Sequence, residues 1–268
     1  MQGLMAGKRG LVMGVANDHS IAWGIAKKLA EHGAELAFTY QGEAFGKRVR
    51  PLAQSVGSDI LLPCDVEDVS TVDAVFSELK AKWGKIDFLV HAIAFSDKNE
   101  LKGLYANTSR ENFVRSMVIS CFSFTEIAAR AAPLMSDGGS MITLTYGGST
   151  RVMPNYNVMG VAKAALEASV RYLANDFGPD NIRVNAISAG PVRTLAGAGV
   201  SDARLMFNFQ KRNAPLRRTV EIDEIGGSAL YLLSDLSSGV TGEIHFVDSG
   251  YSTISMPRID ELKTTDRE

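Results

Sequence analysis

Cysteine is scarce in this sequence, which has only Cys64 and Cys121 among its 268 residues. Two thiols are too few for a disulfide framework, and neither lies beside a cluster of potential metal ligands. We therefore expect both cysteines to be small buried side chains in a reducing compartment, and we expect no metal site.

Long apolar runs and an excess of one charge are also missing. The apolar stretch that follows Lys8 and Arg9 ends at Asn17, too early for a signal peptide or a membrane span. No other stretch reaches the roughly 20 apolar residues that a span requires. The formal net charge is −2, and basic residues are scattered among acidic ones. We expect a soluble, cytoplasmic protein that binds neither nucleic acid nor membranes.

What the sequence does contain is a regular alternation of short apolar runs and helical patterns, which is typical of a parallel sheet with helical crossovers. Ile21, Ile25 and Leu29 are an example of the helical spacing. No linker or internal repeat interrupts the pattern. The prediction is an α/β, Rossmann-type, doubly wound parallel sheet of about seven strands with helices on both faces, in a single domain over residues 1–268. The expected strands are 9–13, 35–40, 59–64, 88–93, 140–145, 182–187 and 244–247.

Ligands of such sheets bind outside the carboxyl ends of the strands. After the first strand, the glycine fingerprint Gly-x-Gly-x-x-Gly of many dinucleotide sites is absent. Gly14 still permits a tight turn, and Ser20 can either cap the next helix or bind a phosphate. The free N–H groups where that helix begins, at Ile21, favour an anion. We interpret this turn as a phosphate-binding site.

Polar residues also follow the second and third expected strands. Gln41 can bind ribose hydroxyls but does not repel a 2′-phosphate, so this residue alone leaves NAD and NADP open. Asp65 can accept a hydrogen bond from an adenine amine, and Val66 can pack on the ring. Asp65 can equally cap the next helix, and the two roles are compatible.

After the fifth strand, Tyr156 precedes Lys163 by seven residues. Ketoreductases of the short-chain dehydrogenase type have a Tyr-x3-Lys pattern, and Met159 occupies that tyrosine position here. Two helical turns return to nearly the same face with a rise of ~10 Å, so the two side chains can cooperate.

This displacement favours reduction of a carbon–carbon double bond. In an enoyl thioester, hydride enters the β carbon while charge develops on an oxygen two carbons away. Tyr156 can stabilise that enolate oxygen. Lys163 can hold the cofactor ribose, and its charge is expected to make the phenol more acidic.

Together these residues resemble the bacterial enoyl-acyl-carrier-protein reductases of type II fatty acid synthesis, a divergent branch of the short-chain dehydrogenases. The resemblance extends to about Ser255. Its most specific stretches are 36–41 (LAFTYQ), 154–163 (PNYNVMGVAK) and 183–196 (RVNAISAGPVRTLA).

The resemblance implies NADH as hydride donor, with NADPH possible, an enoyl-acyl carrier protein as substrate, and a homotetramer. A glutamine at position 41 resembles the NADH-preferring members of the family. The implied catalytic residues are Tyr146, Tyr156 and Lys163. The implied cofactor contacts are Gly14, Ser20, Ile21, Gln41, Asp65, Val66, Ile93, Lys163, Val192, Arg193, Thr194, Leu195 and Ala196.

The segment at about 193–213 resembles the family's substrate-binding flap. Its apolar residues either line the acyl chain or pack the helix on the core. The expected substrate contacts are Ser96, Tyr146, Tyr156, Met159, Met206 and Phe207. Ser96 lies where the family's backbone meets the substrate, and His91 is expected to be a packed, hydrogen-bonded histidine rather than a catalytic one.

An acidic carrier protein requires a basic rim near the flap. Arg204, Lys211 and Arg212 are available, whereas Ser201 and Leu205 stand where basic residues also occur in the family. Carrier docking is therefore expected either to be weaker or to use other residues. Two other functions compete with the enoyl reductase. The first is a ketoreductase of the same fold, which the methionine at position 159 disfavours. The second is a non-catalytic nucleotide-sensing protein, which the presence of both Tyr156 and Lys163 disfavours.

Overall fold

Seven parallel strands form one sheet in the order β3-β2-β1-β4-β5-β6-β7. This is the fold of the computed structural model, which describes residues 3–192, 194 and 203–260. The direction of winding reverses between β1 and β4, as in other doubly wound sheets. The predicted Rossmann-type α/β fold is thus confirmed. The strands are β1 (Arg9–Met13), β2 (Glu35–Tyr40), β3 (Ile60–Pro63), β4 (Phe88–His91), β5 (Gly139–Thr145), β6 (Ile182–Ala189) and β7 (Ile244–Val247).

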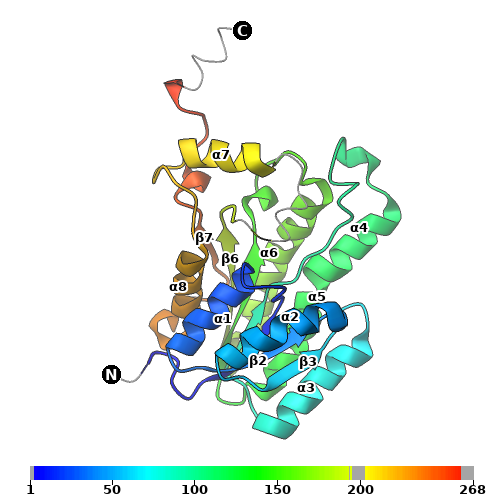
Figure 1. The fold of residues 1–268 in the computed structure, drawn as a ribbon, viewed down its shortest axis with the longest axis vertical. Helices are drawn as coiled ribbons and strands as arrows, with labels where there is room; N and C mark the ends of the chain where they lie inside the picture. The colour runs from blue at the N-terminus through cyan, green and yellow to red at the C-terminus, as the bar shows by residue number, and fades with distance from the viewer. Residues whose placement is uncertain (1–2, 193, 195–202, 261–268) are drawn as a thin grey trace.

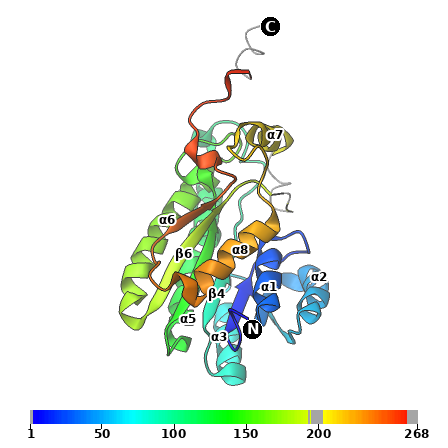
Figure 2. The same ribbon diagram turned by 90° about the vertical axis from the view of Figure 1, so that its left-hand side faces the viewer.

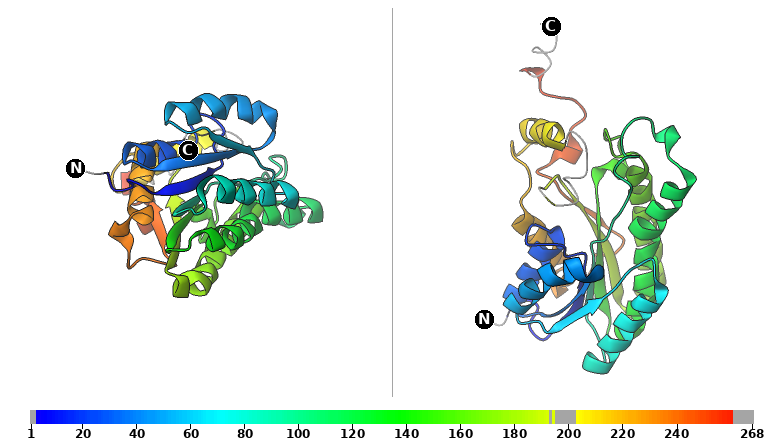
Figure 3. Two further views of the ribbon diagram at one scale, coloured as in Figure 1. Left: turned by 90° about the horizontal axis from the view of Figure 1, so that it is seen from below. Right: turned by 45° about the vertical axis from the view of Figure 1, so that its right-hand side comes forward.

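Helices cover both faces of the sheet, as Figures 2 and 3 show. Side chains alternate along each strand, so Val12 packs with one helical layer while Leu11 and Met13 pack with the other. The layer on Val12 consists of α1 (Ile21–Glu31), α2 (Gly42–Ser55) and α8 (Ile222–Leu233). The opposite layer consists of α3 (Val69–Trp83), α4 (Arg110–Met117), α5 (Ser123–Ala131) and α6 (Asn157–Phe177).

One continuous helix, Arg110–Leu134, contains α4, a π-helical turn (Val118–Phe122) and α5. By length and composition alone it is apolar enough to cross a membrane, with a mean hydropathy of 1.2. This does not contradict the expectation of no membrane span, because the core helix of a globular protein can have the same length and composition. Half of the apolar window is buried inside the protein, which is typical of the core helix of a globular domain. Both predicted buried cysteines are confirmed as buried free thiols, with Cys121 on this helix.

The helix α7 (Ala203–Asn213) lies beyond the carboxyl ends of the strands, above the main body in Figure 1. The first turn, after β1, also lies at this edge. Gly14 has a φ of +99°, and a Cβ atom there would collide with the carbonyl oxygen of Ala92 after β4. Glycine is therefore required by the backbone approach at the reversal point of the sheet.

We predict that Gly14→Ala lowers the free energy of unfolding by roughly 2–4 kcal/mol, because the left-handed backbone and the collision with Ala92 both penalise a side chain. Gly57→Ala is the matched control, since Gly57 has a φ of +75° but open space around its Cα. The control should lose only about 1 kcal/mol. Urea unfolding of both variants measures the difference. Equal losses of unfolding free energy would contradict the prediction, because they would show that the collision with Ala92 costs nothing.

Candidate active site

Two tyrosines meet at the carboxyl end of β5. Tyr146 directly follows this strand, and its ring centroid lies 5.1 Å from that of Tyr156 in an edge-to-face arrangement. The loop between them contains Gly148, where a Cβ atom would collide with the Tyr156 ring. The chain therefore places both aromatic rings together because the intervening glycine leaves room for them.

Tyr156 is the residue that precedes the first turn of α6, not a member of the helix. The residues on either side, Asn155 and Asn157, have positive φ values of 58° and 37°. Asparagine tolerates this conformation better than most residues, although it remains uncommon. The expectation that Tyr156 and Lys163 share a helix face was therefore wrong in detail. Tyr156 is positioned by the sharp entry of the chain into the helix, and Lys163 by the helix itself.

The Tyr156 hydroxyl has no hydrogen-bond partner among residues 3–192, 194 and 203–260. None of the described residues has a polar side-chain atom that is both buried and without a partner, so this unpartnered hydroxyl is accessible. Burial and the neighbouring Tyr146 raise the pKa of this phenol well above its usual value. This contradicts the expected acidifying effect of Lys163, because desolvation is the main cause of the shift and Lys163 does not contribute to it. At neutral pH the site therefore offers an intact O–H donor.

Lys163 lies in the interior, on the sheet-facing side of α6, with 5% of its surface exposed. Its Nζ atom donates a hydrogen bond to the carbonyl oxygen of Leu144 on β5, at 2.7 Å. Desolvation lowers the pKa of this ammonium to about 8. One turn later on the same helix is Glu167, a buried carboxylate that the sequence analysis missed. The Thr145 hydroxyl donates to its Oε1 atom at 2.6 Å. The interval of four residues after Lys163 was the available signal.

At the ends of β2 and β3, the structure brings Gln41 and Asp65 together. The Gln41 Nε2 atom donates to Asp65 Oδ2 at 3.0 Å, and Asp65 Oδ1 accepts from the backbone N–H of Glu67. Asp65 is not a helix cap, because Asp68 caps α3 instead by accepting from the N–H of Ser70. Val66 is buried directly beside this pair. Gln41 and Asp65 thus form a polar edge next to the apolar side chain of Val66.

The turn after β1 contains Ser20 at the start of α1, but the Ser20 side chain does not cap the helix. Its Oγ atom instead accepts from the N–H groups of Ala16 and Asn17, at 3.0 and 3.1 Å. The Ser20 hydroxyl thus fixes the conformation of the turn. In the common fingerprint, glycines permit the tight turn instead. The first turn of α1, from Ile21, contains no acidic residue, so its N–H groups favour an anion.

The segment after β4 is fixed by side chains of the long helix. His91 is fully buried, with Nδ1 3.0 Å from Thr143 Oγ1 and Nε2 2.9 Å from Ser123 Oγ, which confirms the predicted packed histidine. Desolvation, followed by the charge of Lys163, lowers the His91 pKa to about 3, so the ring is neutral.

Two further contacts hold the backbone beyond His91. The Ser120 hydroxyl pairs with both the N–H and the carbonyl oxygen of Phe95. Ser96 is tied to Asn112, and Ile93 packs against the core. Met159 is nearly buried beside Tyr156, and its sulfur accepts from Ser120 at 3.7 Å. This segment and Met159 therefore form one rigid wall of the site.

The flap helix α7 contacts the same site through Gln210, which the sequence analysis also missed. The Gln210 Nε2 atom donates to the Tyr146 hydroxyl at 3.2 Å, and Met206 and Phe207 are partly buried. Val192 packs on the core from the other end of this segment. Among the remaining predicted contacts, Thr194 is described, whereas Arg193, Leu195, Ala196 and Ser201 lie outside the described residues.

Comparisons with known proteins agree with this geometry. The family model described as enoyl-(acyl carrier protein) reductase matches residues 14–252. Enoyl-[acyl-carrier-protein] reductase [NADH] 2 of Rhizobium meliloti is 74% identical over 268 residues, with all of both chains covered. The NADH reductase FabI of Rickettsia typhi is 54% identical, with 96% of this chain and 98% of the relative covered.

Solved structures are equally similar. FabI from Candidatus Liberibacter asiaticus superposes with a TM-score of 0.94 at 64% identity, covering 96% of this chain and 100% of the other. The enoyl-(acyl-carrier-protein) reductase from Anaplasma phagocytophilum, solved in complex with NAD, superposes with a TM-score of 0.93 at 58% identity. In that case 97% of this chain and 99% of the other are covered.

Proposed function

The chain belongs to the enoyl-[acyl-carrier-protein] reductase family, and on that premise we propose that it reduces the trans-2 double bond of enoyl thioesters with NADH. The observation that carries the proposal is the Tyr156 hydroxyl, accessible and without a hydrogen-bond partner in the described part of the chain, seven residues before the buried Lys163. A hydroxyl in this state is available to a ligand oxygen.

We assign to Tyr156 the binding of the thioester carbonyl oxygen. NADH, when bound, would supply hydride to the β carbon, and negative charge would develop on this oxygen. Because the Tyr156 pKa is raised, the phenol keeps its proton and donates a hydrogen bond that strengthens as the charge grows. Tyr146 lies edge-to-face with Tyr156 and limits where the acyl group can lie.

Lys163 serves the cofactor rather than the substrate in this proposal. An ammonium held at β5 can donate to ribose hydroxyls next to the nicotinamide. The ketoreductase alternative requires a proton donor where Met159 stands, and a thioether has no proton to donate. No observation favours that alternative.

The described residues fit a dinucleotide. The N–H groups that open α1 suit the pyrophosphate, and the edge formed by Gln41, Asp65 and Val66 suits the adenosine. The Asp65 carboxylate, held beside Gln41 at 3.0 Å, would repel a 2′-phosphate. This supports NADH over NADPH.

We further propose an enoyl-acyl carrier protein as the natural substrate, in type II fatty acid biosynthesis in the cytoplasm. Arg204 and Lys211 are exposed on α7, next to the flap residues Met206 and Phe207. Cations at the entrance of a site attract an acidic carrier and speed its association.

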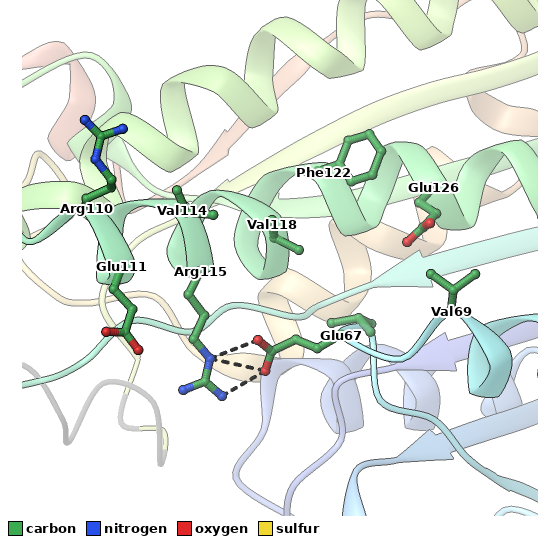
Figure 4. A pocket seen from close by; sticks show the side chains of 10 residues that line it. Glu67, Val69, Arg110, Glu111, Val114, Arg115, Val118, Phe122 and Glu126 are labelled. Carbon is green, nitrogen blue, oxygen red and sulfur yellow. Dashed lines mark hydrogen bonds and ion pairs between the residues drawn. The ribbon is translucent and has the colours of Figure 1, made fainter.

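The proposed homotetramer is supported by a shallow apolar groove on the outer side of the long helix (Figure 4). Val114 and Phe122 line one wall and are each 53% exposed, and Val69 lines the other at 47%. Arg115 and Glu67 form a bidentate ion pair across the groove. Contiguous exposed apolar side chains with a polar rim are typical of a protein interface.

The function is tested by mixing the protein with crotonyl and acetoacetyl thioesters and following NADH and NADPH oxidation by absorbance. We expect oxidation of NADH with the crotonyl thioester, slower oxidation of NADPH, and little reaction with the acetoacetyl thioester. A preference for the acetoacetyl thioester would contradict the assignment as an enoyl reductase.

Tyr156→Phe and Lys163→Ala should separate catalysis from cofactor binding. Loss of one oxyanion donor should lower kcat about 10²–10³-fold, with NADH affinity changed less than about twofold. Loss of the buried ammonium should weaken NADH binding at least about tenfold. Fluorescence titration and steady-state kinetics measure both effects, with thermal unfolding to verify folding. Unaltered NADH affinity in Lys163→Ala would refute the ribose role.

For the oligomer, light scattering should give the mass of four chains, and Phe122→Glu should lower it, because a charge cannot be buried in the apolar groove. Val152→Glu is the control, since Val152 is 98% exposed and lies outside the groove. If the wild-type protein is a monomer, or if both variants have the same mass, the groove is not a subunit interface.

A further inference from the structure

Glu167 is a buried ionisable residue that the proposed chemistry does not use. Only 6% of its surface is exposed, although it stands in the middle of α6. Glutamate is rarely buried without a partner, because desolvation of a carboxylate is expensive. One hydroxyl donor, from Thr145 at 2.6 Å, satisfies hydrogen bonding at Oε1 but supplies no opposite charge.

Lys163 lies four residues earlier on the same helix, and Glu167 helps to raise the pKa of its ammonium. Both side chains attach to the end of β5, through adjacent residues. Lys163 donates to the Leu144 carbonyl oxygen, and Glu167 accepts from the Thr145 hydroxyl. Strand β5 thus holds the two charged groups in a fixed relation to one another.

The other titratable groups around Lys163 carry no negative charge at neutral pH. His91, from β4, is neutral, because burial holds its pKa at about 3. Cys121, from the π-helical turn, remains a thiol, because burial raises its pKa. The pKa of Tyr156 is raised as well, so the phenol keeps its proton. Within the described ranges, two groups raise the pKa of Lys163, first Cys121 and then Glu167, and Glu167 is the carboxylate of the two.

We propose that Glu167 is a positioning residue whose buried carboxylate is the counter-charge that keeps Lys163 a cation for cofactor binding. The inference rests on the proposed function in one respect, namely that the Lys163 ammonium binds NADH. Without the carboxylate, the buried ammonium would face neutral groups alone and would release its proton at a lower pH.

Two substitutions separate this electrostatic effect from a merely structural one. Glu167→Gln removes the charge but keeps an oxygen that can accept from Thr145. Thr145→Val is the matched control, because it removes the hydrogen bond and keeps the carboxylate. NMR titration of ¹³C-labelled lysine side chains in the full chain, with the Lys163 signal assigned by its loss in Lys163→Arg, reports the protonation midpoint directly.

We expect the wild-type midpoint near the pKa of about 8 of the folded protein, and a midpoint lower by about one pH unit in Glu167→Gln. Thr145→Val should keep the wild-type midpoint. A one-unit fall reduces the protonated fraction at pH 8 from about a half to about a tenth, so NADH binding there should weaken about fivefold. At pH 6 the two proteins should bind NADH almost equally.

An unshifted midpoint in Glu167→Gln would overturn the proposal, even if NADH binding were weaker at every pH, since uniform weakening indicates a structural role alone. If Glu167→Gln does not fold, Glu167→Asp is the alternative. Its side chain is one methylene group shorter, which moves the carboxylate and should lower the Lys163 midpoint by a smaller amount. Its failure to do so would also overturn the proposal. If the wild-type protein fails to bind NADH, the proposed function fails, while the titration still decides the coupling of Glu167 to Lys163.

Discussion

The attachment of α6 to the end of β5 is the constraint on which the site depends. Lys163 and Glu167 reach the strand through Leu144 and Thr145, and the next residue along the chain is Tyr146. A strand end fixed in this way determines where the loop back to α6 can run. That loop returns at Tyr156, held by a left-handed asparagine on each side. The positions of both tyrosines and of the lysine therefore follow from one strand–helix contact.

Much of this arrangement could be predicted from the sequence. Apolar runs located all seven strands, because strands covered on both faces are apolar at consecutive positions. The interval from Tyr156 to Lys163 predicted the candidate site, and the position of Met159 favoured an enoyl over a keto substrate. These features are local in the chain, so their spacing is visible without a structure.

Other features depend on contacts between distant residues and could not be predicted. Gln210 reaches Tyr146 across 64 residues, and no local pattern marks an amide for that contact. The cap of α3 falls on Asp68 rather than Asp65, because α3 begins at Val69, and Asp65 instead accepts from Gln41, which follows β2. The pKa of Tyr156 rises where a nearby cation was expected to lower it, since desolvation depends on packing that sequence spacing does not reveal.

The turn after β1 would meet the physical requirement of the proposed phosphate site without the usual glycines. A phosphate site needs a tight backbone and unpaired N–H groups at a helix start. Gly14 supplies the close approach to Ala92, and the Ser20 hydroxyl gathers the N–H groups of Ala16 and Asn17. One glycine and one hydroxyl thus replace several glycines. A comparable replacement is found at Tyr156, where a phenol whose pKa is raised by burial stands in place of the expected acidic one. Such a phenol stabilises charge by donating a hydrogen bond, and the charge in an enoyl thioester develops away from the carbon that receives hydride. A donor that keeps its proton is therefore suited to an enolate oxygen, and less to a ketone, whose oxygen must be protonated to complete the reaction.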